Sequence, residues 1–590
     1  MKIIEPKQSE AALAITKKRY LMTDKNGRVI ETPGEMLWRV AQYLAKPEVL
    51  WSDNGQVKLV AEEFYKLMAA KKFVCSGKAM FEAGNPGGSG QLAACFVLPI
   101  EDSIDGIFKT LGQAAVIHKN NGGTGFNFSK IRPHGDKVKN VPHAASGPVD
   151  FIKAFSAALS KILQGAKRQG GNIAIVNSDH PDIKDFITMK AEDGTIKNFN
   201  VSVGATDAFM KAVVGKKPWR LINPRTKEIV ATFRADKLFD LICEYAWKTA
   251  DPGMAFLDRA ERDNPTPTLG KLEATNPCGE IYLLPYESCN LGSINLSEHV
   301  SSGKVDWDSL KNTVHWGIRF LDNMVEVNNY PLEEIRRLVK DGNRRIGLGV
   351  MGLAHLFFKL GIPYNSSKAV DLSAKLAKFI RQEADKATQK LGKERGNFGN
   401  YDVSVYVETG KPRRNCATTM IAPTGTISLF ADCSSGIEPV FALTTTRQTF
   451  FEDDTNNRPT KALTITDPVY QKYKDKYDRT VFVTSHEIGW DWHVKQQAAW
   501  QKYFDNSVSK TINFPHTGTV KDVKDAYLLA WKLGCKGITV YRDGSKADQV
   551  LSSNTVSQCH GEACPECGFE LVFKEGCSTC TKCGFSKCSL

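Results

Sequence analysis

The stretch Ala274-Thr-Asn-Pro-Cys-Gly-Glu-Ile-Tyr282 places an amide, a thiol and a carboxylate at alternate positions, as Asn276, Cys278 and Glu280. In an extended segment alternate side chains point to the same side, so these three groups would meet in one small volume. The proline and the glycine between them argue against a helix and predict an exposed loop tip. The stretch therefore predicts a reactive loop.

The thiol of this loop has no histidine near it in the sequence. A nucleophilic cysteine normally needs a histidine base, and the nearest histidines are His180 and His299. A neighbouring carboxylate raises the pKa of a thiol and so disfavours the thiolate. The neutral thiol is then the useful form, which favours hydrogen-atom chemistry. Taken alone, the motif would more often be a buried free cysteine beside a turn.

Other motifs change that interpretation. Together with the opening stretch, they resemble four segments of ribonucleotide reductase large subunits, in the expected order. These segments are the strand with the first redox cysteine, the glycine-rich loop beside the substrate, the finger loop with the second redox cysteine, and the phosphate loop. In this chain they are Gln91-Leu-Ala-Ala-Cys-Phe-Val-Leu-Pro99, Asn121-Gly-Gly-Thr-Gly-Phe-Asn-Phe128, residues 274–282 with Glu287-Ser-Cys-Asn-Leu-Gly-Ser-Ile-Asn-Leu296, and Ala422-Pro-Thr-Gly-Thr-Ile-Ser428. The resemblance runs from about Lys18 to the C-terminus.

The resemblance implies an α/β fold: a ten-stranded α/β barrel with the finger loop threaded into its centre. It would occupy residues 61–545, after an N-terminal helical segment over residues 1–60. A helix is expected from Thr32 to Ala45, with a threonine cap and a proline in the first turn. Many family members carry a regulatory nucleotide-binding helical module ahead of this point. The sequence leaves no room for one, so we expect no overall-activity site.

The resemblance also assigns roles. Cys278 would carry the radical, Glu280 would act as general base, and Asn276 would orient the ribose hydroxyls. Cys95 and Cys289 would supply proton and electrons and end as a disulfide, which requires their Cα atoms to lie within about 7 Å. On its own, Cys95 in its apolar run reads as a structural core residue.

The same resemblance implies a substrate site around the thiol and the phosphate loop. Glycine and hydroxyl residues before a presumed helix can bind phosphate through backbone N–H groups and the helix dipole. The residues expected to bind the ribonucleotide are Ser76, Ala94, Cys95, Gly122, Gly123, Asn276, Pro277, Gly279, Pro423, Thr424, Gly425, Thr426 and Ile427. Lys78 either contacts a phosphate or is a solvated surface lysine, and the sequence favours neither interpretation.

The segment from Cys535 to Gly544 indicates the subclass. Reductases that depend on a small subunit carry two adjacent tyrosines here, whereas this chain has Val540 followed by a single Tyr541. This resembles the adenosylcobalamin-dependent class II, in which the cofactor generates the radical beside the active site. The motif set favours a diphosphate substrate. One alternative is a class I-type large subunit that needs a radical-generating small subunit. The other is a non-catalytic nucleotide- or nucleic-acid-binding protein.

Residues 146–163 read as an amphipathic helix with a serine cap at Ser146. In the family such a helix lies at a homodimer interface, and nearby loops sense a dNTP specificity effector. In the basic, glycine-rich loop that follows, Lys167 and Arg168 either contact effector phosphates or are merely exposed. Further helices are expected over residues 236–260 and 306–325.

Seven of the fifteen cysteines fall in the last 32 residues. We expect a flexible linker over residues 546–562 and a cysteine-rich zinc-ribbon and redox tail over residues 563–590. The favoured zinc ligands are Cys564, Cys567, Cys580 and Cys583, which leaves Cys577 and Cys588 as thiols that pass electrons from a thioredoxin- or glutaredoxin-like reductant. In a competing partition zinc takes the cysteines at 564, 567, 577 and 580.

Bulk properties agree with a metabolic enzyme of the reducing cytoplasm. The net charge of +13 over 590 residues is not gathered into long basic runs, so no stable nucleic-acid complex is expected. The sequence has no apolar run long enough for a membrane span and no apolar signal core at the N-terminus. The uneven cysteine distribution also argues against a secreted disulfide scaffold.

Overall fold

The computed structural model describes residues 3–164, 168–191, 196–449 and 461–545, together with three short strands at 571–574, 577–580 and 586–588. The chain divides into two compact units. The first holds residues 1–443 and 468–547, and the second holds residues 444–467 and 548–590. No helix among the described residues is both long and apolar enough to cross a membrane.

The first unit begins with helices, as the sequence predicted: α1 (Glu10–Arg19), α2 (Pro33–Ala45) and α3 (Asn54–Ala69). A reciprocal cap starts α2. The Thr32 hydroxyl accepts the N–H of Glu35 at 3.2 Å, and the Glu35 carboxylate accepts the N–H of Thr32 at 2.7 Å. The cap satisfies two of the backbone donors that a helix start leaves open.

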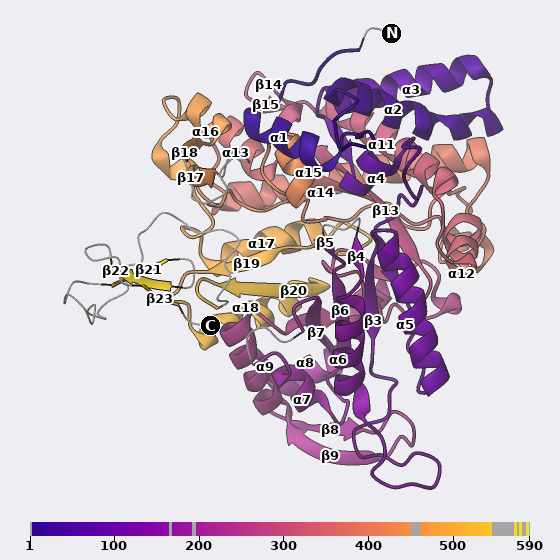
Figure 1. Ribbon diagram of the computed structural model, residues 1–590, viewed down its shortest axis with the longest axis vertical. Coiled ribbons are helices and arrows are strands. Elements are labelled where there is room, and N and C mark those ends of the chain that lie inside the picture. Colours follow the sequence, from indigo (N-terminus) through magenta and orange to yellow (C-terminus); the bar gives the residue numbers. More distant parts are fainter. Residues whose placement is uncertain are drawn as a thin grey trace. The chain divides into compact units, whose positions relative to one another are not determined.

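Five parallel strands form one half of the main sheet. They are adjacent in the order β2 (Cys95–Val97), β3 (Gly123–Asn127), β6 (Asn172–Asn177), β7 (Phe199–Ala205) and β10 (Gly253–Phe256). Parallel neighbours need long crossover connections, usually helices. Here the connections contain α5 (Ile104–Lys119), α6 (Gly147–Leu159), α7 (Ile183–Thr188), α8 (Asp207–Val214) and α9 (Ala235–Thr249), which surround the strands in Figure 1.

Four of the other strands run antiparallel to this half, two at each of its ends. At one end β20 (Gly537–Arg542) pairs with β10, and β19 (Thr511–Phe514) runs parallel to β20. At the other end β13 (Ser288–Asn295) pairs with β2, and β16 (Ile346–Met351) runs parallel to β13. With β1 (Phe73–Cys75) on β13, the described residues contain a ten-stranded sheet.

Single bridges extend the pairing beyond the named strands. Leu348 of β16 bridges Thr419, and Ile421 bridges Val508, both in parallel orientation. The backbone segment that contains Val508 leads directly into β19. The segments that connect β13, β16, β19 and β20 along the chain contain five of the helices. These are α11 (Trp307–Val327), α13 (Leu353–Leu360), α14 (Ser367–Arg395), α17 (Trp490–Gln501) and α18 (Val520–Lys532).

Two helix predictions need correction. The segment 236–260 is not one helix, because α9 ends at Thr249 and β10 precedes a separate α10 (Leu257–Arg262). Pro252 explains the break, since proline has no N–H to continue a helix. The Ser146 side chain makes no capping hydrogen bond, because its own backbone is already helical at φ −78° and ψ −24°. The prediction of a helix over 306–325 is confirmed by α11.

A hairpin of two short strands, β11 (Ala274–Thr275) and β12 (Tyr282–Leu283), packs against one face of the sheet. Its side chains share one hydrophobic cluster with residues of β2, β6, β10 and β13. The hairpin passes very close to β3. A Cβ built on Gly125 would lie 1.7 Å from the carbonyl oxygen of Thr275. Only glycine at this position leaves room for the hairpin.

The second unit contains the antiparallel pair β17 (Thr444–Thr449) and β18 (Lys461–Thr466). It also contains the three antiparallel strands β21 (Leu571–Lys574), β22 (Cys577–Cys580) and β23 (Ser586–Cys588). Cys577 is the register partner of Cys588. Of the expected zinc ligands, Cys564, Cys567 and Cys583 lie outside the described residues, as does the linker 546–562.

The glycine at position 125 gives a test of this packing. In a Gly125→Ala variant the methyl group would meet backbone rather than a movable side chain, so the hairpin or β3 must shift. We expect a loss of about 1–3 kcal/mol of stability, measured as a lower midpoint of thermal unfolding. Gly112→Ala is the matched control, because a Cβ there meets nothing within 4 Å on an exposed face of α5. Equal midpoints for the two variants would contradict the close approach.

Candidate functional site

Cys278 lies at the tip of the hairpin, in a tight turn. The N–H of Gly279 donates to the carbonyl of Asn276 at 3.0 Å, which closes a four-residue β-turn. Asparagine first, proline second and glycine fourth are the residues that a type I turn favours. The exposed loop tip predicted from the sequence is confirmed. The segment is a turn rather than an extended strand, so alternate side chains do not share one face.

The turn separates the three polar groups by burial. Cys278 is exposed, whereas Asn276 and Glu280 are 1% and 2% exposed. They still lie close to a common neighbour, the thiol of Cys95. The Asn276 amide donates to the sulfur of Cys95 at 3.3 Å, and the charges of Glu280 and Cys278 both act on this thiol. The amide oxygen of Asn276 accepts the N–H of Ile281 at 3.2 Å, which holds the side chain in place.

Cys95 and Cys289 are register partners on the antiparallel strands β2 and β13. Cα atoms of directly opposite residues in such a pair lie about 4.5–5.5 Å apart. This satisfies the distance that a disulfide between them requires. Both thiols are buried, and burial raises the pKa of each well above its ordinary value. At neutral pH both are therefore protonated.

Glu280 has an unusual environment for a carboxylate. Burial raises its pKa to about 7, although the Asn276 amide opposes the shift. Within the described part of the chain, its Oε2 atom has no hydrogen-bond partner. A carboxyl group that titrates near neutral pH can accept a proton from a substrate and return it.

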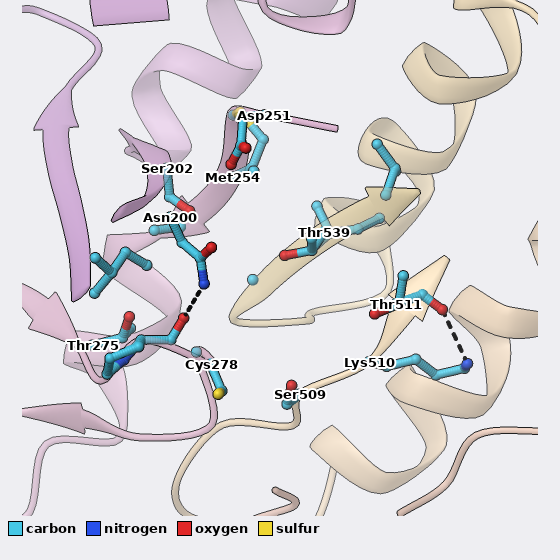
Figure 2. Close-up of a pocket in the computed structure, with 18 of the residues that line it drawn as sticks. Asn200, Ser202, Asp251, Met254, Thr275, Cys278, Ser509, Lys510, Thr511 and Thr539 are labelled. Carbon is cyan, nitrogen blue, oxygen red and sulfur yellow. Dashed lines mark hydrogen bonds between the residues drawn. The ribbon is translucent and has the colours of Figure 1, made fainter. Parts of the chain in front are cut away.

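Beside this cluster lies a cavity of about 380 Å³ (Figure 2). Cys278 and Pro277 form part of its wall, and the strands β7, β10 and β20 supply nearly half of the rest. Asn200, Ser202 and Thr539 are among the polar residues that line it, and the single Tyr541 lines it as well. A cavity of this size lies in the usual range for small-molecule sites.

Several residues expected at the substrate lie together. The N–H of Gly123 donates to the carbonyl of Ala94 at 2.7 Å, and Gly123 is the register partner of Cys95. A Cβ on Gly123 would lie 3.1 Å from the ring of Pro277. A Cβ on the neighbouring Gly122 would lie 2.5 Å from the Ile117 side chain, so a side chain at either position would crowd its neighbours.

The phosphate loop ends at a short helix, α15 (Gly425–Phe430), which contains the expected Thr426 and Ile427. Thr424 precedes it with a left-handed φ of 54°, and its hydroxyl accepts the N–H of Gly436 at 2.7 Å. Pro423 reaches the wall of the cavity beside Cys278.

Residues around Ser76 form a separate turn. The Ser76 hydroxyl caps the helix α4 (Gly77–Glu82) by accepting the N–H of Ala79 at 3.3 Å. Lys78 is not a solvated surface lysine, because its side chain is 7% exposed and pairs with Glu82 at 3.1 Å. Of the two effector candidates, Lys167 lies outside the described residues. Arg168 begins the short strand β5 (Arg168–Gln169), of which only the backbone is described.

Two features of the site were missed from the sequence. Arg345 and Glu287 form a fully buried ion pair at 2.9 Å, and both act on the Cys289 thiol. The side-chain amide of Asn200 donates to the carbonyl of Pro277 at 2.8 Å. The charged pair Arg344-Arg345 directly before an apolar strand could have drawn attention to the first feature. Nothing in the local sequence marks the second.

Comparison with known proteins agrees with this geometry. The sequence model described as "Ribonucleotide reductase, barrel domain" matches residues 93–412 and 409–541, and the one described as "Ribonucleotide reductase, all-alpha domain" matches residues 6–88. The chain belongs to the ribonucleotide reductase family. The resemblance drawn from the motifs is confirmed.

Curated relatives place the chain within the family. A protein of Mycobacterium tuberculosis named "Vitamin B12-dependent ribonucleoside-diphosphate reductase" is 44% identical, over 93% of this chain and 81% of its own length. A protein of Thermoplasma acidophilum with the same name is 41% identical, over 92% of this chain and 80% of its own length. A "Ribonucleoside-diphosphate reductase subunit alpha" of Chlamydia pneumoniae is 26% identical, over 89% of this chain and 58% of its own length. The higher identities group the chain with class II reductases.

Accessibility of the thiols gives a direct test of the site. Among the eight described free cysteines, Cys278 is exposed and the other seven are buried. We expect iodoacetamide to alkylate Cys278 well before those seven in the native protein, as measured by peptide mass spectrometry. A Cys278→Ser variant should lose this early modification and retain the slow ones. Equally fast modification of Cys95 or Cys289 would contradict the burial of the pair.

Proposed function

We propose that this chain is a class II ribonucleotide reductase that converts ribonucleoside diphosphates to 2′-deoxyribonucleotides, with adenosylcobalamin as the radical source. The observation that carries the proposal is the arrangement at the hairpin tip. An exposed thiol stands next to a buried pair of register-matched thiols and a carboxyl group whose pKa is about 7. The names of the relatives at 41% and 44% identity support both the cofactor and the diphosphate substrate.

The cavity beside Cys278 fits the adenosyl end of that cofactor. Its volume of about 380 Å³ suits a nucleoside-sized group, and Ser202, Thr539 and Tyr541 offer hydroxyl groups to a ribose and a purine. The exposed Cys278 thiol borders the same space. When bound, the cofactor supplies the oxidising equivalent that turns this thiol into a thiyl radical.

The residues of the chain then carry the reaction. The Cys278 sulfur removes the 3′-hydrogen of the ribose, while Glu280 takes the proton of the 3′-hydroxyl group. Asn276 orients the ribose hydroxyls. The 2′-hydroxyl leaves as water, Cys95 and Cys289 provide two electrons and two protons, and a disulfide forms between them. Cys278 then returns the hydrogen atom to the 3′-carbon of the product radical, so the product keeps its 3′-hydrogen and the sulfur is again a thiyl radical. The sum is one ribonucleotide and two thiols giving one deoxyribonucleotide, one disulfide and water.

We assign substrate binding to the residues expected from the sequence. Five residues would contact the nucleoside, since most of them lie close to Cys278 or Cys95. They are Ala94, Gly122, Gly123, Pro277 and Gly279. The loop from Pro423 to Ile427 would bind the phosphates through backbone N–H groups at the start of α15, with Ser76 as a further hydroxyl contact.

We infer that the ten-strand sheet closes into a barrel over residues 61–545. Two sets of parallel strands, antiparallel to each other, support this inference. The bridges from Leu348 to Thr419 and from Ile421 to Val508 also support it, because they connect the β16 side of the sheet with the β19 side. The hairpin would then lie inside the barrel, as its share in the inner hydrophobic cluster suggests.

We also propose a homodimer that binds a dNTP specificity effector near residues 165–172. An apolar stripe on α5 supports the dimer. Ile104 and Phe108 are 61% and 56% exposed, and Leu111 and Ala115 continue the stripe at helical spacing on a helix that neighbours α6. A stripe of this kind favours an interface.

For the tail we propose a zinc site at Cys564, Cys567, Cys580 and Cys583, with a redox dithiol at Cys577 and Cys588. The backbone register supports the dithiol, because Cys577 and Cys588 are opposite partners in β22 and β23. A thioredoxin- or glutaredoxin-type protein would reduce it. The cytoplasmic location stays a prediction.

The reductase reaction gives the first test. We expect CDP to be reduced to dCDP with dithiothreitol only when adenosylcobalamin is present, and to leave a Cys95–Cys289 disulfide when the reductant is omitted. Cys278→Ala should reduce turnover to background, since it removes the radical-bearing sulfur. Cys243→Ala, which deletes a buried thiol on α9, is the matched control and should retain activity. Turnover without the cofactor, once a radical-generating small subunit is added, would favour a class I-type large subunit instead. No nucleotide turnover would favour a non-catalytic nucleotide-binding protein.

The environment of Glu280 predicts a pH dependence. The carboxyl group must be deprotonated to act as base, and its pKa is raised to about 7. We therefore expect kcat/KM to rise as pH increases through about 7. Glu280→Gln should lower kcat by on the order of 10²–10⁴-fold and abolish this rise, whereas Glu280→Asp should keep it. A wild-type profile that stays flat through neutral pH would contradict the assignment.

A further inference from the structure

One hydrogen bond joins the sheet to the turn that carries the reactive thiol. The side-chain amide of Asn200, on β7, donates to the carbonyl oxygen of Pro277 at 2.8 Å (Figure 2). Pro277 directly precedes Cys278. Asn200 is exposed and forms part of the cavity wall, so no packing requirement explains an asparagine there.

This bond acts on the peptide plane next to the thiol. The carbonyl of Pro277, the N–H of Cys278 and the Cα atom of Cys278 lie in one plane, because the peptide bond does not rotate freely. A donor that fixes the oxygen therefore fixes the tilt of the plane. The direction in which the Cys278 side chain leaves the backbone depends on that tilt.

The proline ring itself rests on backbone. A Cβ on Gly123 would lie 3.1 Å from the ring of Pro277, and a Cβ on Gly171 would lie 3.6 Å from it. These glycines support the turn from one side. On the far side of Cys278 the turn is open, since a Cβ on Gly279 would meet nothing within 4 Å. The contacts at Pro277 are thus the last support before the thiol.

The strand that carries Asn200 is more rigid than the turn to which Asn200 donates. β7 is a central strand that pairs with β6 on one side and β10 on the other, with Asn200 opposite Ile173. The β6 ladder holds the Cα atom of Asn200 on one side, and on the other side the pairing with β10 begins two residues further on, at Ser202. The side-chain amide of Asn200 therefore links the sheet by a hydrogen bond to a turn that has free space around its tip.

From this geometry we infer that Asn200 is a positioning residue for Cys278: it clamps the Pro277–Cys278 peptide so that the sulfur is held at one place in the cavity. The inference rests on the proposed function, because a radical thiol is where such placement matters. A hydrogen bond of this kind contributes about 0.5–1.5 kcal/mol to stability. Its effect on rate can be larger, since a displacement of about 1 Å can cost on the order of 100-fold in a reaction step.

Asparagine suits this role because only its nitrogen can donate to the carbonyl oxygen. In Asn200→Asp a carboxylate oxygen would face the carbonyl oxygen and repel it. In Asn200→Ala the donor is absent and nothing replaces it. The matched control is Asn329→Ala. Asn329 is also exposed, and its amide also donates to a backbone carbonyl, that of Ser89 at 2.9 Å, but it does not line the cavity.

The test measures steady-state kinetics and hydrogen–deuterium exchange of the turn. We expect Asn200→Ala and Asn200→Asp to lower kcat by about 10- to 100-fold with KM for CDP unchanged. We also expect exchange at the N–H groups of Gly279 and Ile281 to become several-fold faster in the protein without substrate. Asn329→Ala should match the wild type in both measurements.

Each other outcome overturns the inference. Wild-type exchange in both variants would show that the bond does not hold the turn. A lower kcat with unchanged exchange would show that Asn200 acts on a bound molecule in the cavity. Faster exchange with unchanged kcat would show that the placement of the thiol does not limit the reaction. The exchange measurement needs no turnover, so it separates failure of the clamp from failure of the proposed reductase activity.

Discussion

The close approach of the hairpin to β3 is the constraint on which the site depends. The carbonyl of Thr275 lies where any side chain at position 125 would have to be. This contact sets how closely the hairpin approaches the sheet. The close approach in turn places Asn276 within hydrogen-bond distance of Cys95 and puts Cys278 at the wall of the cavity. The glycines of β3 are therefore part of the site, although they have no side chain to offer.

Burial supplies most of the chemistry. Glu280 has its pKa raised to about 7 because it has been removed from water, and Cys95 and Cys289 are kept protonated by the same cause. These are the protonation states that the proposed reaction requires: a base that can accept and return a proton, and thiols that hold their hydrogen. Cys278 differs from all three because the turn carries it out of the cluster into the cavity. A single hairpin thus places the Cys278 thiol at an accessible position, while Glu280, Cys95 and Cys289 stay buried away from water.

Particular residues show how far sequence reasoning reached. The turn of Asn276 to Gly279 could be predicted, since proline and glycine act on the local backbone. The pairing of Cys95 with Cys289 could be proposed only through the family resemblance, because 194 residues separate them. The long helix expected over residues 236–260 was wrong, since the apolar pattern continued across Pro252 into β10. The assignments of the effector and zinc residues fall largely outside the described chain and stay proposals.

The sequence by itself determined the local features and the family. It established the exposed loop tip, the helical start, the α/β class and the single tyrosine, because each is encoded by neighbouring residues or by a motif. Only the tertiary structure decided which groups act together. The Asn200 contact to Pro277, the buried Arg345–Glu287 pair and the raised pKa of Glu280 all arise between residues, or from surroundings, that are remote in the chain. The physical reason is that hydrogen bonds and desolvation depend on distance in space, which the order of residues does not specify.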